Sequence, residues 1–206
     1  MNDGRRIFQL FAELVDYPQS DQAGVARECA SLIALQCPEA AAHLGKFAAF
    51  AEVTSLERVQ EVFVGVFELN ATCHPYIGYH LFGESYKRSV FLLGLKEQLD
   101  ARGLSYGTEL PDHLAVLLRF LSICDDDALA EELIRVAMLP ALDKMSGARK
   151  EDDAPKSGEP DPQRSGFKAY QDVLQALRLT LRATYGEALV GADAPMADAI
   201  PMMSGD

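Results

Sequence analysis

The sequence has no tryptophan, only four cysteines and no excess of positive charge. The cysteines are scattered along the chain, without a CxxC pair or a Cys/His spacing that suits a tetrahedral zinc site. They are Cys29, Cys37, Cys73 and Cys124. We therefore expect free, buried thiols in a reducing cytoplasm, and neither a metal site nor a bound cofactor.

The charge is strongly one-sided, because 31 acidic residues outweigh 19 basic ones and give a formal net charge of −12. Such a surface repels phosphate backbones and anionic lipid, so nucleic acid is not an expected partner. A cationic peptide is better suited, although the same acidity also serves solubility. No apolar run approaches the roughly 20 residues that cross a bilayer, so stable membrane insertion is not expected either.

Apolar residues recur with helical spacing through most of the chain, as Ile7, Leu10, Phe11 and Leu14 do at i, i+3, i+4 and i+7. Helix-start signals separate these segments, and the alternation typical of strands is missing. The sequence therefore predicts an all-α fold, a single-domain bundle of about eight or nine helices. Helices are expected over residues 5–16, 20–36, 38–52, 54–67, 84–102, 111–124, 128–144 and 167–185.

The domain organisation follows from composition. With 206 residues, 49% of them hydrophobic, the chain can bury one core, and roughly 100–200 residues make one domain. Residues 146–165 are rich in Gly, Pro, Lys and acidic residues and have no apolar face, which predicts a flexible linker. We expect a helical core over residues 1–145, a helix over 166–186 that docks on it, and a disordered tail over 187–206.

The helical period breaks between Asn70 and Gly83, where aromatic residues are frequent and an ordered loop or a short helix is expected. Two segments here carry a resemblance: CHPYIGYHLFGESYKR at residues 73–88 and ELPDHL at residues 109–114. They resemble the assembly chaperones of respiratory molybdoenzymes, of the nitrate reductase delta-subunit type. Those chaperones are related to the ones that serve trimethylamine oxide and dimethyl sulfoxide reductases. The resemblance covers about residues 61–121 and includes Phe67-Glu68-Leu69.

This resemblance implies a cytoplasmic, all-helical chaperone and not an enzyme. Its partner would be the cofactor-free catalytic subunit of a molybdoenzyme, held by its N-terminal leader until the molybdenum cofactor is inserted, before export or membrane docking. The resemblance also implies a client-binding role for Glu109, Pro111, Asp112 and His113. The aromatic loop is closest to chaperones of periplasmic dimethyl sulfoxide reductase relatives. A monomer and a helix-swapped dimer both stay open, because the linker is long enough for a swap.

A twin-arginine type of leader carries two positive charges followed by an apolar helix, so its receptor needs an apolar groove with carboxylates at one end. The carboxylates nearest the aromatic loop in sequence are Glu84, Glu109 and Asp112, and the groove would be lined by Tyr76, Tyr79, Phe82 and Leu114. A simpler interpretation is that Glu84 caps a helix and Asp112 complements the dipole of a helix that starts at Pro111.

Other interpretations of the same residues give other functions. Asp112 and His113 could form an acid–base pair of a small-molecule enzyme, although no nucleophile motif accompanies them. The chain could also be a permanent accessory subunit of a respiratory complex. His74 and His80 are six residues apart, a poor spacing for a helical metal site. Arg88, with Lys87, is expected on a solvated face or paired with Glu84.

Overall fold

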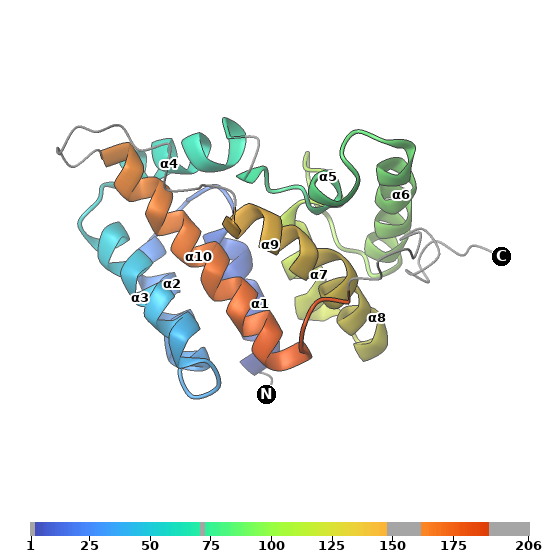
Figure 1. Ribbon diagram of the computed structural model, residues 1–206, viewed down its shortest axis with the longest axis horizontal. Helices are drawn as coiled ribbons and strands as arrows, with labels where there is room; N and C mark the ends of the chain where they lie inside the picture. Colours follow the sequence, from blue (N-terminus) through green and yellow to red (C-terminus); the bar gives the residue numbers. More distant parts are fainter. Residues whose placement is uncertain (1–2, 71–72, 148–161, 190–206) are drawn as a thin grey trace.

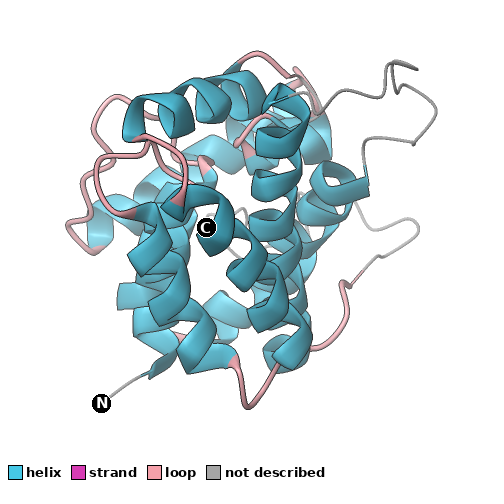
Figure 2. Ribbon diagram, turned by 90° about the vertical axis from the view of Figure 1, so that its left-hand side faces the viewer, coloured by secondary structure: helices cyan, strands magenta, loops and turns pink. Residues whose placement is uncertain are grey.

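The computed structural model describes residues 3–70, 73–147 and 162–189. Within these ranges the chain is helical and forms no strand, and the only β-type pairing is one isolated antiparallel bridge between Tyr76 and His113. Figure 2 shows the same helices from one side of the bundle. The predicted all-α class is confirmed.

The N-terminal half forms where the apolar spacing predicted it. α1 (Asp3–Leu14) buries Ile7, Leu10, Phe11 and Leu14 on one face. α2 (Gln22–Ile33) has Asp21 as its N-cap, and the Asp21 side chain accepts a hydrogen bond from the Gly24 N–H at 2.9 Å. α3 (Pro38–Glu52) has its proline at the first helical turn, where a missing N–H costs nothing. α2 packs on α1 and α3, and α1 also packs on α7.

Two helical runs each contain a π-helical segment, in which the turn is wider than in an α-helix. α4 (Leu56–Phe63), capped by the Ser55 hydroxyl, continues into the π-helical segment η1 (Val64–Glu68). α8 (Asp127–Glu132), capped by Asp126, continues through the π-helical η3 (Leu133–Met138) into α9 (Leu139–Gly147). With these continuous runs counted once, the described residues hold nine helices, the upper end of the predicted number.

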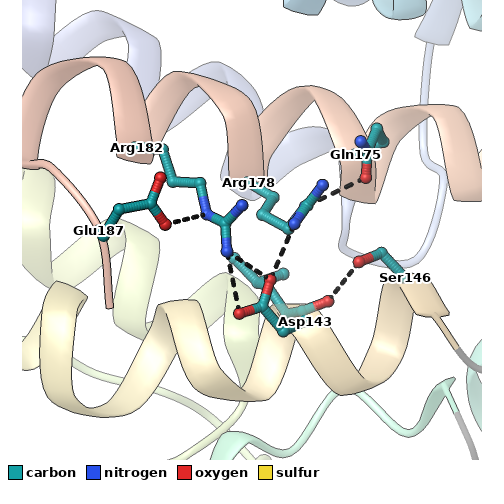
Figure 3. Close-up of polar contacts among 7 residues, drawn as sticks. Asp143, Ser146, Gln175, Arg178, Arg182 and Glu187 are labelled. Atoms are coloured by element: carbon teal, nitrogen blue, oxygen red, sulfur yellow. Dashed lines mark hydrogen bonds and ion pairs between the residues drawn. The ribbon is translucent and has the colours of Figure 1, made fainter. Parts of the chain in front are cut away.

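α10 (Pro162–Tyr185) is the long orange helix in Figure 1 and lies against α3, α4 and α9. Tyr170, which is fully buried, contacts the rings of Phe47, Phe63 and Phe67. Two arginines of α10 also reach α9. Asp143 of α9 accepts hydrogen bonds from Arg178 at 2.9 Å and from Arg182 at 3.0 Å (Figure 3). α10 is therefore fixed by apolar packing in the core and by charged contacts along its edge.

The predicted linker and tail fall mostly on residues 148–161 and 190–206, which lie outside the described part of the chain. At their borders, helix occupies more residues than expected, because α9 reaches Gly147 and α10 begins at Pro162. After α10, Leu189 donates its N–H to the Arg135 carbonyl at 3.0 Å, so the start of the predicted tail contacts η3.

α5 (Ile77–Phe82), α6 (Tyr86–Ala101) and α7 (Leu114–Ile123) complete the fold. α5 and α6 lie at the end of the long axis opposite α2 and α3 (Figure 1). α6 ends before Gly103, whose φ of 65° is the left-handed conformation expected there. The predicted helix start at residue 111 is wrong, since α7 begins at Leu114. None of the described helices is long and apolar enough to cross a membrane.

Candidate functional site

The two segments singled out by sequence meet in the fold. Ile77 donates its N–H to the Asp112 carbonyl at 2.9 Å, and Leu114 donates to the Pro75 carbonyl at 2.7 Å. These two bonds form the antiparallel bridge between Tyr76 and His113. Residues 75–88 and 109–114 therefore form one unit, which we call the junction. It joins α5 and α6 to the start of α7.

The Asp112 carboxylate lies at the centre of the junction, with a fully buried side chain. It accepts hydrogen bonds from the Gly78 N–H and from Nε of Arg88, both at 3.1 Å. Burial raises the pKa of Asp112, while the Arg88 guanidinium and the Gly78 N–H oppose that shift. The helix-dipole interpretation of Asp112 is therefore wrong, because its charge is directed at α5 and α6 and α7 begins two residues later.

Gly78 is required by this close approach. A Cβ atom at residue 78 would lie 2.8 Å from Oδ2 of Asp112 and 3.0 Å from the ring of Phe91. Contacts shorter than 3 Å force a neighbour to move, and both neighbours are buried. The absent side chain therefore lets α5 come close enough for the Gly78 N–H to reach the carboxylate.

Arg88 was expected in solvent or beside Glu84, and that expectation is wrong. Its side chain is 17% exposed and pairs with Asp112, 24 residues away. The guanidinium carbon also lies 5.7 Å from the ring centroid of Tyr76 and 6.0 Å from that of Tyr79, within cation–π range. Sequence spacing could not identify this pair, because rules for i+3 and i+4 neighbours do not reach across the chain.

His113 is the N-cap of α7, where Nδ1 accepts the Ala115 N–H at 3.2 Å. That bond requires an unprotonated Nδ1, and burial lowers the pKa of His113, so the neutral ring is favoured. No hydrogen bond joins the described side chains of His113 and Asp112, which have separate partners. The acid–base pair considered from sequence is therefore not formed.

Glu109 contacts the aromatic loop directly. Oη of Tyr76 donates to Oε2 of Glu109 at 2.9 Å. Burial and this carboxylate together raise the pKa of Tyr76 to about 12, so the phenol keeps its proton at neutral pH. The Tyr76 ring also meets the His113 ring edge to face, with centroids 5.4 Å apart. The Tyr76 side chain is thus held by its hydroxyl, through Glu109, and by its ring, through His113.

The two histidines of the loop have structural partners. Nδ1 of His74 lies 3.2 Å from the Phe67 carbonyl, and Nε2 of His80 lies 2.7 Å from the His74 carbonyl. The Tyr79 ring packs against both imidazoles. Burial lowers the pKa of His80. Among the described residues, no group of three or more His, Cys, Asp or Glu side chains is placed to hold a metal ion.

The predicted site residues divide into two sets by exposure. The buried set supports the junction from inside and comprises Pro111, Asp112, His113 and Leu114. The accessible set is half-buried or exposed and comprises Tyr76, Tyr79, Phe82, Glu84 and Glu109. Leu114, which is fully buried, does not line an open groove. Glu84 does not cap α6 either, because Ser85 holds the N-cap position and makes no side-chain cap bond.

An apolar cavity lies elsewhere, between α1, α2 and the C-terminal half of α10. Its volume is about 330 Å³. Leu32 and Leu35 line one side of it, and Leu177 and Leu181 line another. Sequence reasoning did not predict this cavity, because its walls come from three helices whose apolar faces each look like ordinary core.

Comparison with known protein families agrees with the resemblance. The family described as nitrate reductase delta subunit matches residues 34–146, which is more than half of the chain and includes the whole junction. This chain belongs to the nitrate reductase delta subunit family. The family comprises maturation proteins and not enzymes. The chain is therefore a chaperone for the maturation of a molybdoenzyme.

Other comparisons add little to the family match. The crystal structure of a candidate redox enzyme maturation protein from Archaeoglobus fulgidus is similar, with 23% sequence identity and a TM-score of 0.44. The similarity covers 71% of this chain and 85% of that one. No curated protein matches the sequence. The assignment to the delta subunit family therefore depends on residues 34–146.

Proposed function

We propose that this chaperone binds the N-terminal leader of the cofactor-free catalytic subunit and holds it until the molybdenum cofactor is inserted. The observation that supports this most is the junction. It gathers both segments of the family resemblance at one end of the molecule and leaves acidic and aromatic side chains accessible there. Carboxylates suit the basic pair of a leader, and aromatic rings suit its apolar part.

The two sets of junction residues have different tasks in this proposal. Glu84 and Glu109 are the carboxylates that meet the positive charges of the leader, and Tyr79 and Phe82 provide apolar contact. The buried set does not touch the leader. It fixes the loop geometry through the carboxylate of Asp112 and the cap formed by His113.

The place and timing of binding follow from the same proposal. A leader is accessible to the chaperone in the cytoplasm, before the client is exported or docked on the membrane. The aromatic loop, through Tyr76, Tyr79 and Phe82, favours a client related to the periplasmic dimethyl sulfoxide reductases. The complete catalytic subunit without its cofactor would then co-purify with the chaperone, and the mature enzyme would not.

Calorimetric titration with a synthetic leader peptide of a molybdoenzyme catalytic subunit, which carries an arginine pair followed by an apolar segment, tests the proposal. We expect saturable one-to-one binding by the wild type. Glu84→Gln and Glu109→Gln should each weaken it about two- to fivefold, the effect of roughly 0.5–1 kcal/mol for an exposed ion pair. Glu57→Gln, an exposed carboxylate at the start of α4, is the matched control and should bind like the wild type.

Both replacements keep the shape of the side chain, and glutamine can still accept the hydrogen bond of Tyr76. They therefore test charge with little risk to folding, unlike Asp112→Ala or His113→Ala, which remove buried partners. Absence of leader binding by folded wild-type protein would contradict the proposal. Stable co-purification with mature, cofactor-loaded enzyme would instead identify a permanent accessory subunit.

A further inference from the structure

α6 is apolar on two opposite faces. Phe91, Leu95 and Leu99 face the core and are buried. On the other side, Tyr86, Val90 and Leu93 follow one another at i, i+4 and i+7, which places them in one row along the helix. Tyr86 is 83% exposed and Leu93 57% exposed, and Val90 between them is half-buried. We call this row the outer stripe.

A helix at the surface ordinarily has polar residues on its outer face, so the outer stripe needs an explanation. Most other strongly exposed apolar residues are single positions at helix ends, which is common in soluble proteins. Leu35 follows α2, Val53 follows α3 and Leu69 follows η1. Among the described residues, only α6 exposes such a row along the body of a helix, over its first half, and α5 is its main packing partner.

Acidic residues lie at both ends of the outer stripe. Glu84 is exposed just before α6, and Glu97 is exposed one turn after Leu93 on the same face. Lys96, on the flank, is paired with Asp100 at 2.6 Å. Lys87 lies about 100° around the helix from Tyr86, so its positive charge is not on the outer stripe. The apolar row is thus bounded by two carboxylates, a pattern that favours a partner with basic residues next to an apolar segment.

The same charges disfavour a second copy of this chain as the partner. If two α6 helices packed antiparallel through their outer stripes, Glu84 of one copy would approach Glu97 of the other. Like charges brought together at an interface oppose association. A cationic and apolar peptide has no such conflict.

We propose that the outer stripe of α6 binds the apolar helix of the client leader, with the basic pair of the leader beside Glu84. This inference rests on the proposed function and extends its site from the junction along α6. The stripe spans residues 86–93, about 10 Å at 1.5 Å per residue, which matches two turns of a leader helix. The surface is continuous with the junction, since Glu84 and Tyr86 are separated only by Ser85.

The double variant Tyr86→Ser, Leu93→Ser tests the inference in the same calorimetric titration. We expect its Kd for the leader to rise at least about tenfold, because two apolar contacts at the centre of the interface are lost. The control is Val53→Ser, Leu69→Ser, which removes two apolar residues of 85% and 80% exposure from other helix ends. It should bind like the wild type.

A second peptide separates the apolar contact from the charge contact. It keeps the basic pair of the leader and has serine in place of its apolar residues. This peptide should bind the wild type weakly and the double variant equally weakly. Thermal unfolding monitored by circular dichroism should show that the double variant is folded, since both replaced side chains are exposed.

Three results would overturn the inference. Wild-type leader affinity in the folded double variant would show that the stripe is not part of the leader site, while leaving the proposed function intact. A dimer of the wild type that becomes monomeric in the double variant, with leader affinity unchanged, would identify a second copy as the occupant. Failure of the wild type to bind any leader would instead overturn the proposed function and this inference together.

Discussion

Asp112 and Asp143 both pair with arginine, but their surroundings differ. Asp112 is fully buried and receives Arg88, so it joins the start of α7 to α5 and α6. Asp143 has 36% of its side chain exposed and receives Arg178 and Arg182, so it joins α9 to α10 (Figure 3). By distance alone the two clusters look equally strong, with donors about 3 Å from the carboxylate in both.

The difference between them lies in what replaces a lost partner. Water can reach Asp143, so a missing arginine is compensated by solvent and the loss of free energy is small. Water cannot reach Asp112, so a missing arginine leaves a buried charge without its counter-charge. The buried cluster therefore controls the geometry of the junction, whereas the exposed one orients the edge of α10 and adds less free energy than the apolar packing around Tyr170.

The largest loss of unfolding free energy is expected for Arg88→Met, which removes the counter-charge of Asp112. Loss of one partner of a buried ion pair costs about 3–5 kcal/mol, and the lower end applies here because Arg88 retains some exposure. Urea unfolding at pH 7 measures this change. Adding Asp112→Asn to Arg88→Met should restore part of the loss, since it removes the orphaned charge. A loss below about 1 kcal/mol would show that water reaches Asp112 and would remove the distinction between the clusters.

A smaller loss of unfolding free energy is expected for Gly78→Ala, which tests the tight packing around Asp112. The new Cβ would lie 2.8 Å from Oδ2 of Asp112, and overpacking of this kind costs about 1–3 kcal/mol. Gly45→Ala is the control, because Gly45 lies inside α3 and, apart from the local backbone of that helix, no atom lies within 4 Å of the added Cβ. It should gain about 0.5–1 kcal/mol from helix propensity. Equal changes in unfolding free energy for both variants would contradict the close approach at Gly78.

Much of the fold was predictable because its helices repeat a simple pattern. Pro38 and Ser55 start helices where the sequence placed them, and the apolar face of α1 is buried as its spacing predicts. Helix ends were less predictable where a contact from a distant segment decided them. α7 begins late because the Leu114 N–H is bonded to Pro75 and His113 provides the cap.

The candidate site was predictable only in part. Sequence identified the two segments, and the family match covers both. It did not distinguish the accessible residues from the buried ones, because acidic residues are assumed to be exposed unless a partner is known. Arg88, the partner of Asp112, is 24 residues away on α6, and no local rule identifies it. The outer stripe was missed for the opposite reason, since Val90 and Leu93 look like core until the packing of α6 is known.

The smallest effect is expected for Asp143→Asn, and it sharpens the comparison from the exposed side. Asparagine keeps one acceptor for Arg182 and removes the charge, and Arg182 still has Glu187 within 3.3 Å. The change in unfolding free energy should stay within about 1 kcal/mol and shrink further as salt is added, because exposed charges are screened. Urea unfolding at low and high salt measures both. A loss as large as that of Arg88→Met, unaffected by salt, would show that Asp143 is as isolated from water as Asp112, so that exposure does not explain the difference.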